Sequence, residues 1–195
     1  MAISVEDIQK LRATTGAGMM KAKGALEASD GDMEKAIQYL REHGEASAAK
    51  RAEREARAGL IDAYIHGGRI GALVEVNCET DFVARTDDFK EFARDVAMHV
   101  AAMGPEYLNA EAVPAEIVAR EREIYAKEVE GKPAEIVEKI IAGKLAKYYE
   151  GVCLMNQPFI KDNDRTVGQL TTELITKLGE NIVVRRYVRY ELGQV

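Results

Sequence analysis

The chain has 195 residues, of which 47% are hydrophobic and 31% charged, a balance typical of a folded protein with a buried core. No run approaches the roughly 18 consecutive apolar residues of a membrane span, and the N-terminus lacks the layout of a secretory signal, so we expect a cytoplasmic protein without membrane contact. A formal charge of −6 argues against direct nucleic-acid binding, which requires a basic surface. A protein or small-molecule partner is favoured.

Residues 1–44 are predicted to form a small unit of three helices. Ser4 can cap the first helix, with Asp7 three residues later as a variant of the capping box. The stretches TTGAG and SDGD then separate the second helix from its neighbours, and the third is expected to end at Gly44. A unit of this size is only marginally stable by itself.

Residues 45–58 contain no large apolar side chain and are rich in Ala, Glu and Arg, so they are predicted to form a solvated helical linker. The remaining residues, 59–195, are predicted to form an α+β core, in which helices cover a small antiparallel sheet.

A β-hairpin is predicted to begin at Gly59, where the apolar residues start to alternate. If Gly67 and Gly68 form a two-residue turn, three apolar pairs face each other across the strands. These pairs, expected on one face, are Ile65 with Ile70, Ala63 with Ala72, and Ile61 with Val74. The other face is mixed, so we expect a sheet covered on one side and partly wet on the other.

Helices follow the hairpin. Asp87 or Asp88 can cap the first of them, which carries phenylalanine and valine at helical spacing. Two more are expected at roughly 115–130 and 134–150, separated by EGKP.

The C-terminal part predicts one further helix and one strand. Thr166 and Gln169 form a capping box for the helix, which Gly179 ends. The chain then finishes in the strand NIVVRRYVRYEL. Its arginines could suggest RNA binding, but charges that protect an edge strand from aggregation explain them more simply.

Candidate catalytic patterns do not hold together. TGAGMMKAKG has Lys21 where a dinucleotide fingerprint needs glycine, and it follows a helix where that fingerprint follows a strand. Cys78 lies too far from His66 along the predicted hairpin to pair with it, and Cys153 with His99 is better explained as buried structure. We therefore expect no catalytic residue and no cofactor.

A cluster of acidic residues leaves one metal-dependent alternative open. Glu79, Asp81, Asp87 and Asp88 could be imagined around Mg²⁺ or Ca²⁺, as in a small hydrolase. Their spacing fits no known ligand order, and helix capping explains the last two. No metal site is predicted.

Phe82 stands in a polar stretch directly after a strand. Either it folds back beneath the next helix, or it is an exposed anchor that enters a partner's pocket. Met19 and Met20 raise a similar question, because adjacent helical residues point about 100° apart and one of them could be an exposed contact while the other packs in the core.

Three long segments resemble bacterial translation elongation factor Ts. They are LRATTGAGMMKAKGAL at 11–26, YIHGGRIGALVEVNCETDFVAR at 64–85 and CLMNQPFIKD at 153–162, and the resemblance runs in order through almost the whole chain. It implies that the N-terminal three-helix domain is like a ubiquitin-associated domain.

The resemblance also implies nucleotide exchange on elongation factor Tu, the GTPase that delivers aminoacyl-tRNA to the ribosome. The factor would bind its GDP-bound and nucleotide-free forms. In that family the segment matched here by Thr80, Asp81, Phe82 and Val83 reaches the GTPase domain, where the phenylalanine enters a pocket near the Mg²⁺ site and displaces the ion. A non-catalytic scaffold that binds through the N-terminal helices is the alternative.

Further contacts are implied at the N-terminus, where Arg12, Met19 and Met20 match family positions that touch the same GTPase domain. The chain departs from longer members in lacking a second core subdomain and the helical hairpin inserted there. The resemblance to short members implies a homodimer, and whether the C-terminal strand or Cys153 lies at its interface stays open.

Overall fold

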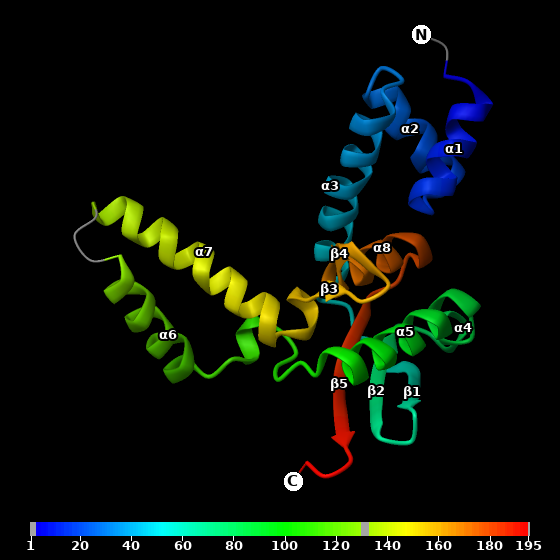
Figure 1. Cartoon of the computed structure of the whole chain (residues 1–195). Helices are drawn as coiled ribbons and strands as arrows, with labels where there is room; N and C mark the ends of the chain where they lie inside the picture. Colours follow the sequence, from blue (N-terminus) through cyan, green and yellow to red (C-terminus); the bar gives the residue numbers. More distant parts are fainter. Residues whose placement is uncertain (1–2, 130–132, 195) are drawn as a thin grey trace. The chain divides into compact units, whose positions relative to one another are not determined.

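The computed structural model describes residues 3–129 and 133–194, and it combines helices with a small antiparallel sheet, which confirms the predicted α+β class (Figure 1). The chain divides into two compact units built from interleaved segments. One unit comprises Met1–Ile61, Glu75–Ala93 and Leu170–Arg185; the other comprises Asp62–Val74, Arg94–Gln169 and Arg186–Val195. The division into domains at residues 44 and 58 stays a prediction.

Three helices open the chain, as predicted: α1 (Val5–Thr15), α2 (Met19–Ala28) and α3 (Met33–Arg51). Ser4 caps α1, because its side chain accepts a hydrogen bond from the backbone N–H of Asp7 at 3.0 Å. Apolar side chains from all three helices form one buried cluster that includes Ile8, Leu11, Ala22, Ala25, Leu26 and Ala36. The likeness to a ubiquitin-associated domain stays a prediction.

The third helix does not end at Gly44 but continues to Arg51. A Cβ atom at Gly44 would lie 3.1 Å from Oγ1 of Thr176, so this position needs a small residue where another segment approaches closely. Glycine inside a helix costs only about 1 kcal/mol relative to alanine, which close packing can offset. Ala48 and Ala56 are buried, so the expected linker is neither wholly helical nor wholly solvated.

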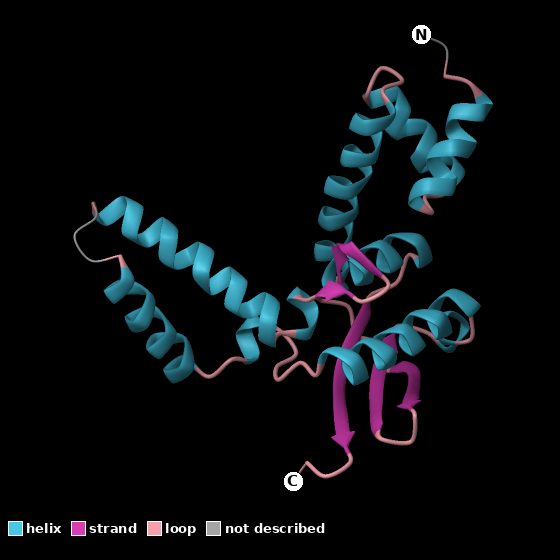
Figure 2. Ribbon diagram, in the orientation of Figure 1, coloured by secondary structure: helices cyan, strands magenta, loops and turns pink. Residues whose placement is uncertain are grey.

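The sheet has the strand order β1-β2-β5, formed by β1 (Ala58–His66), β2 (Ile70–Cys78) and β5 (Ile182–Glu191), which Figure 2 shows in magenta. Gly67 and Gly68 join the first two strands with φ angles of 56° and 69°. Positive φ at both central residues characterises the tight turn of a two-residue hairpin, so the predicted hairpin is confirmed. The predicted C-terminal strand is confirmed as β5.

Burial across the sheet is uneven. Ala72, Val74 and Val76 of the central strand are buried, whereas Ile61 and Ile65 of the edge strand β1 are 62% and 71% exposed. The apolar face predicted from the alternation is therefore covered along β2 but left open along β1.

Helix α5 (Asp87–Met103) buries the predicted stripe of Phe89, Phe92, Val96 and Val100. Neither Asp87 nor Asp88 caps it. The side chain of Thr86 does so, because its hydroxyl oxygen accepts a hydrogen bond from the N–H of Phe89 at 3.3 Å, which places both aspartates inside the first turn.

Helices α6 (Ala115–Glu128) and α7 (Ala134–Val152) run in opposite directions in Figure 1, and the ion pairs Arg122–Glu138 and Lys144–Glu128 join them. The two helices predicted at roughly 115–130 and 134–150 are therefore present, and the lack of a second core subdomain with its inserted hairpin stays a prediction. Most of the predicted break, EGKP, lies outside the described residues.

Short elements surround these helices. They are two 3₁₀ turns, η1 (Ala110–Ala112) and η2 (Leu154–Asn156), and a two-stranded sheet of β3 (Pro158–Phe159) and β4 (Asp162–Thr166). The small sheet is absent from the sequence-based predictions, because a two-residue strand and a five-residue strand without apolar side chains leave no periodic signal.

The last helix, α8 (Val167–Leu178), begins with the predicted capping box. Gln169 Oε1 accepts from the N–H of Thr166 at 2.9 Å, and Oγ1 of Thr166 accepts from the N–H of Gln169 at 3.1 Å. Gly179 follows with φ of 79°, the left-handed conformation that ends many helices.

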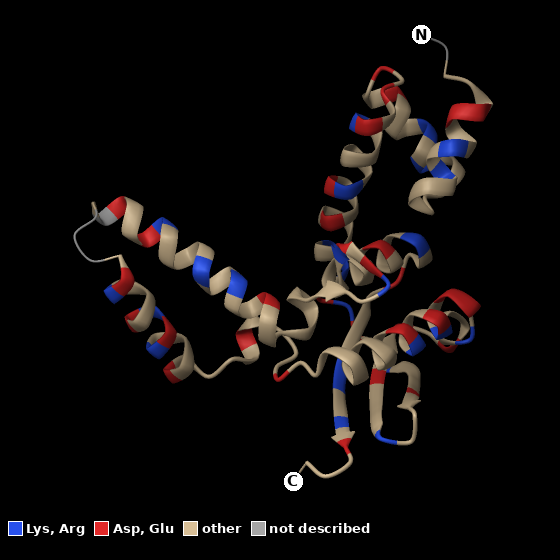
Figure 3. Cartoon of the chain, in the orientation of Figure 1, with Lys and Arg blue, Asp and Glu red and all other residues tan. Residues whose placement is uncertain are grey.

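Arginines stand along the edge strand β5, as Figure 3 shows in blue. Arg185 donates to Oδ1 of Asn77 at 3.0 Å, and Arg189 donates to the carbonyl of Ala101 at 3.1 Å. The protein's own groups thus engage both guanidinium groups, and protection of the edge strand by these charges stays a prediction.

Candidate partner-binding site

A four-residue helix, α4 (Asp81–Ala84), follows strand β2 and carries most of the predicted segment Thr80–Val83. Thr80 has an extended backbone, and its side chain accepts a hydrogen bond from the N–H of Val83 at 3.5 Å, so it caps the helix. Phe82 is 85% exposed. The alternative prediction, in which this aromatic ring folds back beneath the next helix, is therefore wrong.

The chain leaves the core abruptly before this helix. Cys78, the last residue of β2, is fully buried, and its thiol donates to the carbonyl of Thr80 at 3.2 Å. Burial, with a further contribution from the negative charge of Glu180, raises the pKa of Cys78 to about 11. This thiol is therefore uncharged at neutral pH and acts as a small apolar residue with one hydrogen bond.

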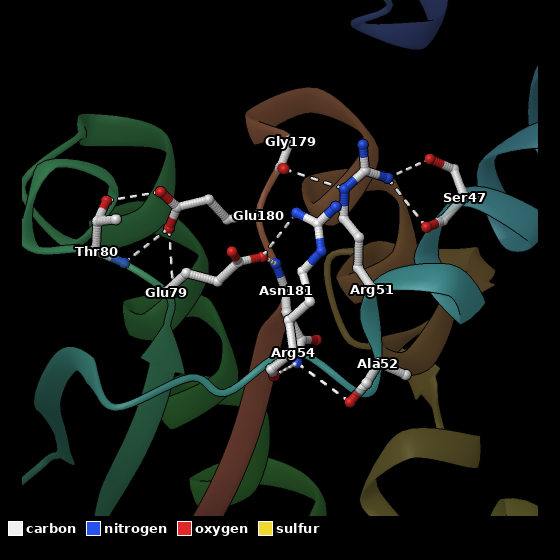
Figure 4. A network of polar contacts seen from close by, with 9 residues as sticks. All are labelled: Ser47, Arg51, Ala52, Arg54, Glu79, Thr80, Gly179, Glu180 and Asn181. Atoms are coloured by element: carbon white, nitrogen blue, oxygen red, sulfur yellow. Dashed lines mark hydrogen bonds and ion pairs between the residues drawn. The ribbon is translucent and has the colours of Figure 1, made fainter.

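Glu180 lies against the start of α4, as Figure 4 shows. One carboxylate oxygen accepts the N–H groups of Glu79 and Thr80 at 3.1 and 3.0 Å, and the other accepts the hydroxyl of Thr80 at 2.6 Å. Three donors on two neighbouring residues thus converge on one carboxylate. Nothing in the local sequence around Thr80 indicates this partner.

A second set of contacts holds Glu79. Its carboxylate accepts the N–H of Asn181 at 2.7 Å and lies 3.5 Å from the guanidinium of Arg54. The side-chain amide of Asn181 donates to the carbonyls of Ala52 and Arg54 at 3.4 and 2.7 Å. The residues Glu79 and Thr80 therefore bond reciprocally with Glu180 and Asn181 (Figure 4).

The N-terminal candidates lie on α1 and α2. Met19 is 46% exposed and Met20 is 77% exposed, so both side chains reach the surface, where core packing was expected for one. Arg12 is exposed in the last turn of α1, and its Nε donates to the carbonyl of Ala17 at 3.2 Å. This hydrogen bond connects the guanidinium group of Arg12 to the loop that precedes Met19 and Met20.

His99 and Cys153 are buried structural residues, as predicted. The N–H of Ile160 donates to Nδ1 of His99 at 3.2 Å, so Nε2 carries the proton and donates to Oε1 of Gln157 at 3.0 Å. Burial lowers the pKa of His99 and raises that of Cys153, which keeps both groups neutral.

The acidic candidates do not gather around an ion. Within residues 3–129 and 133–194, no group of three or more His, Cys, Asp or Glu side chains is placed to hold a metal. Glu79 faces Arg54 and Asn181, and Asp88 forms an ion pair with Lys177 at 2.6 Å.

No helix in the described part of the chain is long and apolar enough to cross a membrane.

Comparison with known proteins places the chain in a family. The family model for elongation factor Ts matches residues 4–194. Elongation factor Ts of Moorella thermoacetica is 59% identical over 195 residues, covering 98% of this chain and 96% of the relative. That of Carboxydothermus hydrogenoformans is 57% identical, covering 98% and 90%, and that of Thermodesulfovibrio yellowstonii is 50% identical, covering 100% and 98%. The chain belongs to the elongation factor Ts family.

Proposed function

We propose that this protein exchanges guanine nucleotide on elongation factor Tu during translation elongation in the cytoplasm, without covalent chemistry. Membership of the elongation factor Ts family implies exchange on that GTPase. The observation that carries the finer proposal is the exposure of Phe82, 85% of whose surface is open on a short, capped helix. A large aromatic side chain that the fold leaves uncovered is suited to a partner's pocket.

Phe82 acts as a wedge in this proposal. A GTPase holds GDP through backbone amides and through a Mg²⁺ ion that requires near-ideal octahedral geometry. Insertion of the ring near that ion, together with Thr80, Asp81 and Val83, displaces the surrounding loops and the Mg²⁺. Each loss of about 1.4 kcal/mol of binding free energy weakens GDP tenfold.

The cycle closes through thermodynamic reciprocity. If the factor weakens nucleotide binding, nucleotide weakens binding of the factor by the same ratio. GTP that enters the nucleotide-free complex therefore releases the factor, which can act again.

The N-terminal helices supply a second contact with the same GTPase. Met19 and Met20 offer flexible apolar side chains, and Arg12 offers a charge beside them. This surface would bring the partner into place, whereas Phe82 would perturb the nucleotide site.

A homodimer is part of the proposal. Apolar side chains stay exposed on or just after the three strands of the main sheet: Ile61, Ile65, Leu73, Tyr190 and Leu192. A second copy would cover them, and sedimentation velocity would measure the mass of the protein in solution. If the protein is a monomer at the concentrations of the exchange assay, the proposed homodimer is wrong. Cys153 is completely buried in the single chain.

The test is release of a fluorescent GDP from purified elongation factor Tu, followed by stopped flow with increasing amounts of the intact protein. We expect a large acceleration that saturates. Binding to the GTPase without a change in the GDP release rate would instead support the alternative, a passive scaffold that docks through the N-terminal helices.

A further inference from the structure

We infer that Glu180 is a positioning residue for nucleotide exchange: it holds Thr80 so that α4 presents Phe82 in the orientation that enters the partner. The inference rests on the proposed function of Phe82. It assigns a role to a residue that lies 100 positions after Thr80 in the chain.

The argument begins with the length of α4, which has four residues. A single helical turn is intrinsically unstable, because its nucleation fixes several backbone angles for one or two hydrogen bonds. The conformation of the segment around Phe82 therefore depends on contacts outside the helix. With its side chain 85% exposed, Phe82 cannot supply them from within the chain.

Glu180 supplies those contacts from a distant segment. Its carboxylate takes the role that a glutamate at the third helical position has in a capping box, since it accepts the backbone N–H of the capping residue, Thr80, at 3.0 Å. That third position is occupied by Val83, whose side chain cannot accept a hydrogen bond.

The carboxylate also determines in which direction the Thr80 hydroxyl donates its hydrogen bond. This hydroxyl has one proton, which it donates to Glu180 at 2.6 Å. The lone pairs of the same oxygen then remain for the N–H of Val83, at 3.5 Å. Glu180 thus secures Thr80 as the acceptor that α4 requires.

Glu180 itself is held from the other side. Arg51 donates to the carbonyl of Gly179 at 3.0 Å, and the side chain of Asn181 is bonded to the backbone at Ala52 and Arg54 (Figure 4). Both neighbours of Glu180 are therefore fixed to the end of α3. A carboxylate anchored in this way can pre-organise α4, which reduces the ordering cost when Phe82 enters its pocket.

The experiment compares Glu180→Gln with the intact protein in the fluorescent GDP assay. Glutamine keeps the shape, but only its oxygen can accept, so either the Thr80 hydroxyl or the N–H groups of Glu79 and Thr80 lose their acceptor. We expect the maximal release rate at saturating factor to fall roughly tenfold, the rate equivalent of one lost hydrogen bond to a charged group. The concentration of factor that gives half of the maximal rate should change little, because the contacts made by the N-terminal helices remain. Glu45→Gln, an exposed residue of α3 with the same change of charge, is the matched control and should behave like the intact protein.

A second measurement separates positioning from general structural damage. If Glu180 acts through Phe82, the double variant Phe82→Ala with Glu180→Gln should release GDP no more slowly than Phe82→Ala alone. Full additivity of the two losses would overturn the inference. So would an unchanged maximal rate in Glu180→Gln, provided that the intact protein accelerates release and Phe82→Ala does not. If the intact protein does not accelerate GDP release, the proposed exchange function itself is contradicted.

Thr80 provides a variant pair should Glu180→Gln fold poorly. Thr80→Val removes the hydroxyl at nearly constant volume and is expected to reproduce the loss of maximal rate, whereas Thr80→Ser keeps the hydroxyl and should lose less of it. Equal activity of the two variants would contradict a role for the Glu180–Thr80 bond.

Discussion

A threonine side chain caps each of the helices α4, α5 and α8, and the caps of α8 and α4 are completed in different ways. Helix α8 has twelve residues, and its capping box is completed by Gln169, three residues after Thr166. Helix α4 has four residues, and the acceptor for the N–H of Thr80 comes from Glu180 in another part of the chain. The first cap is local and the second is long-range.

The difference between the two caps corresponds to how many side chains each helix buries. Helix α8 buries Leu174 and Ile175, so its packing supports the cap and the cap supports its packing. Helix α4 buries only Ala84 and leaves Phe82 exposed, and the residue that caps it is bonded to a remote carboxylate. A short helix that presents an uncovered aromatic side chain needs support from elsewhere in the fold.

The largest expected effect separates function from stability. We predict that Phe82→Ala slows maximal GDP release by at least about thirtyfold, equivalent to ~2 kcal/mol of transition-state stabilisation, as for a buried aromatic anchor. The melting temperature should stay unchanged, since the ring is exposed in the free protein. Stopped-flow release and thermal unfolding measure the two quantities.

Phe92→Ala is the matched control for this prediction. Phe92 is 9% exposed on α5, and its truncation should lower the free energy of unfolding by about 3 kcal/mol or more. A loss of stability in Phe82→Ala comparable with that of Phe92→Ala would show that Phe82 packs in the fold and would contradict the comparison.

The second prediction concerns the local cap. Thr166→Ala should lower the free energy of unfolding by about 1 kcal/mol, because the N–H of Gln169 loses its acceptor. Exchange per folded molecule should not change. Urea unfolding measures the effect, and Thr172→Ala within the same helix is the control, with an expected change of a few tenths of a kcal/mol at most.

The smallest effect at neutral pH is expected at Cys78, behind α4. Its folded pKa is raised to about 11 from an ordinary value of 9.0, so the thiol contributes stability that is complete below pH 9 and is lost as the pH rises through 11. Cys78→Ala should flatten the decline of unfolding free energy in that alkaline range, relative to the intact protein. An equally steep decline in the variant would assign the alkaline loss to other groups.

Much of the fold could be predicted because its determinants are local in sequence. The Gly67-Gly68 turn, the capping box of Thr166 and the apolar spacing of α5 each involve residues a few positions apart. The family resemblance identified Thr80–Val83 as a candidate site, and the structure adds that Phe82 is exposed.

The features that could not be predicted depend on contacts between distant segments. Helix α3 continues past Gly44, where the lack of a side chain leaves room for Thr176, and local sequence gives no sign of such a neighbour. The same holds for Glu180, whose partners are a hundred residues earlier. Sequence patterns report what an element buries, but they do not report which remote side chain supports a short one.

The remote cap has a consequence for how the protein is made. The hairpin of β1 and β2 can form as soon as it has been synthesised, because its strands are joined by a two-residue turn. Glu180 follows Thr80 by 100 residues, which a ribosome adds in roughly 5–20 seconds at ordinary elongation rates. During that interval the nascent chain already has its hairpin but not the carboxylate that orders α4. If Phe82 acts in exchange as proposed, the segment that carries it would therefore become ordered only after most of the chain has been made.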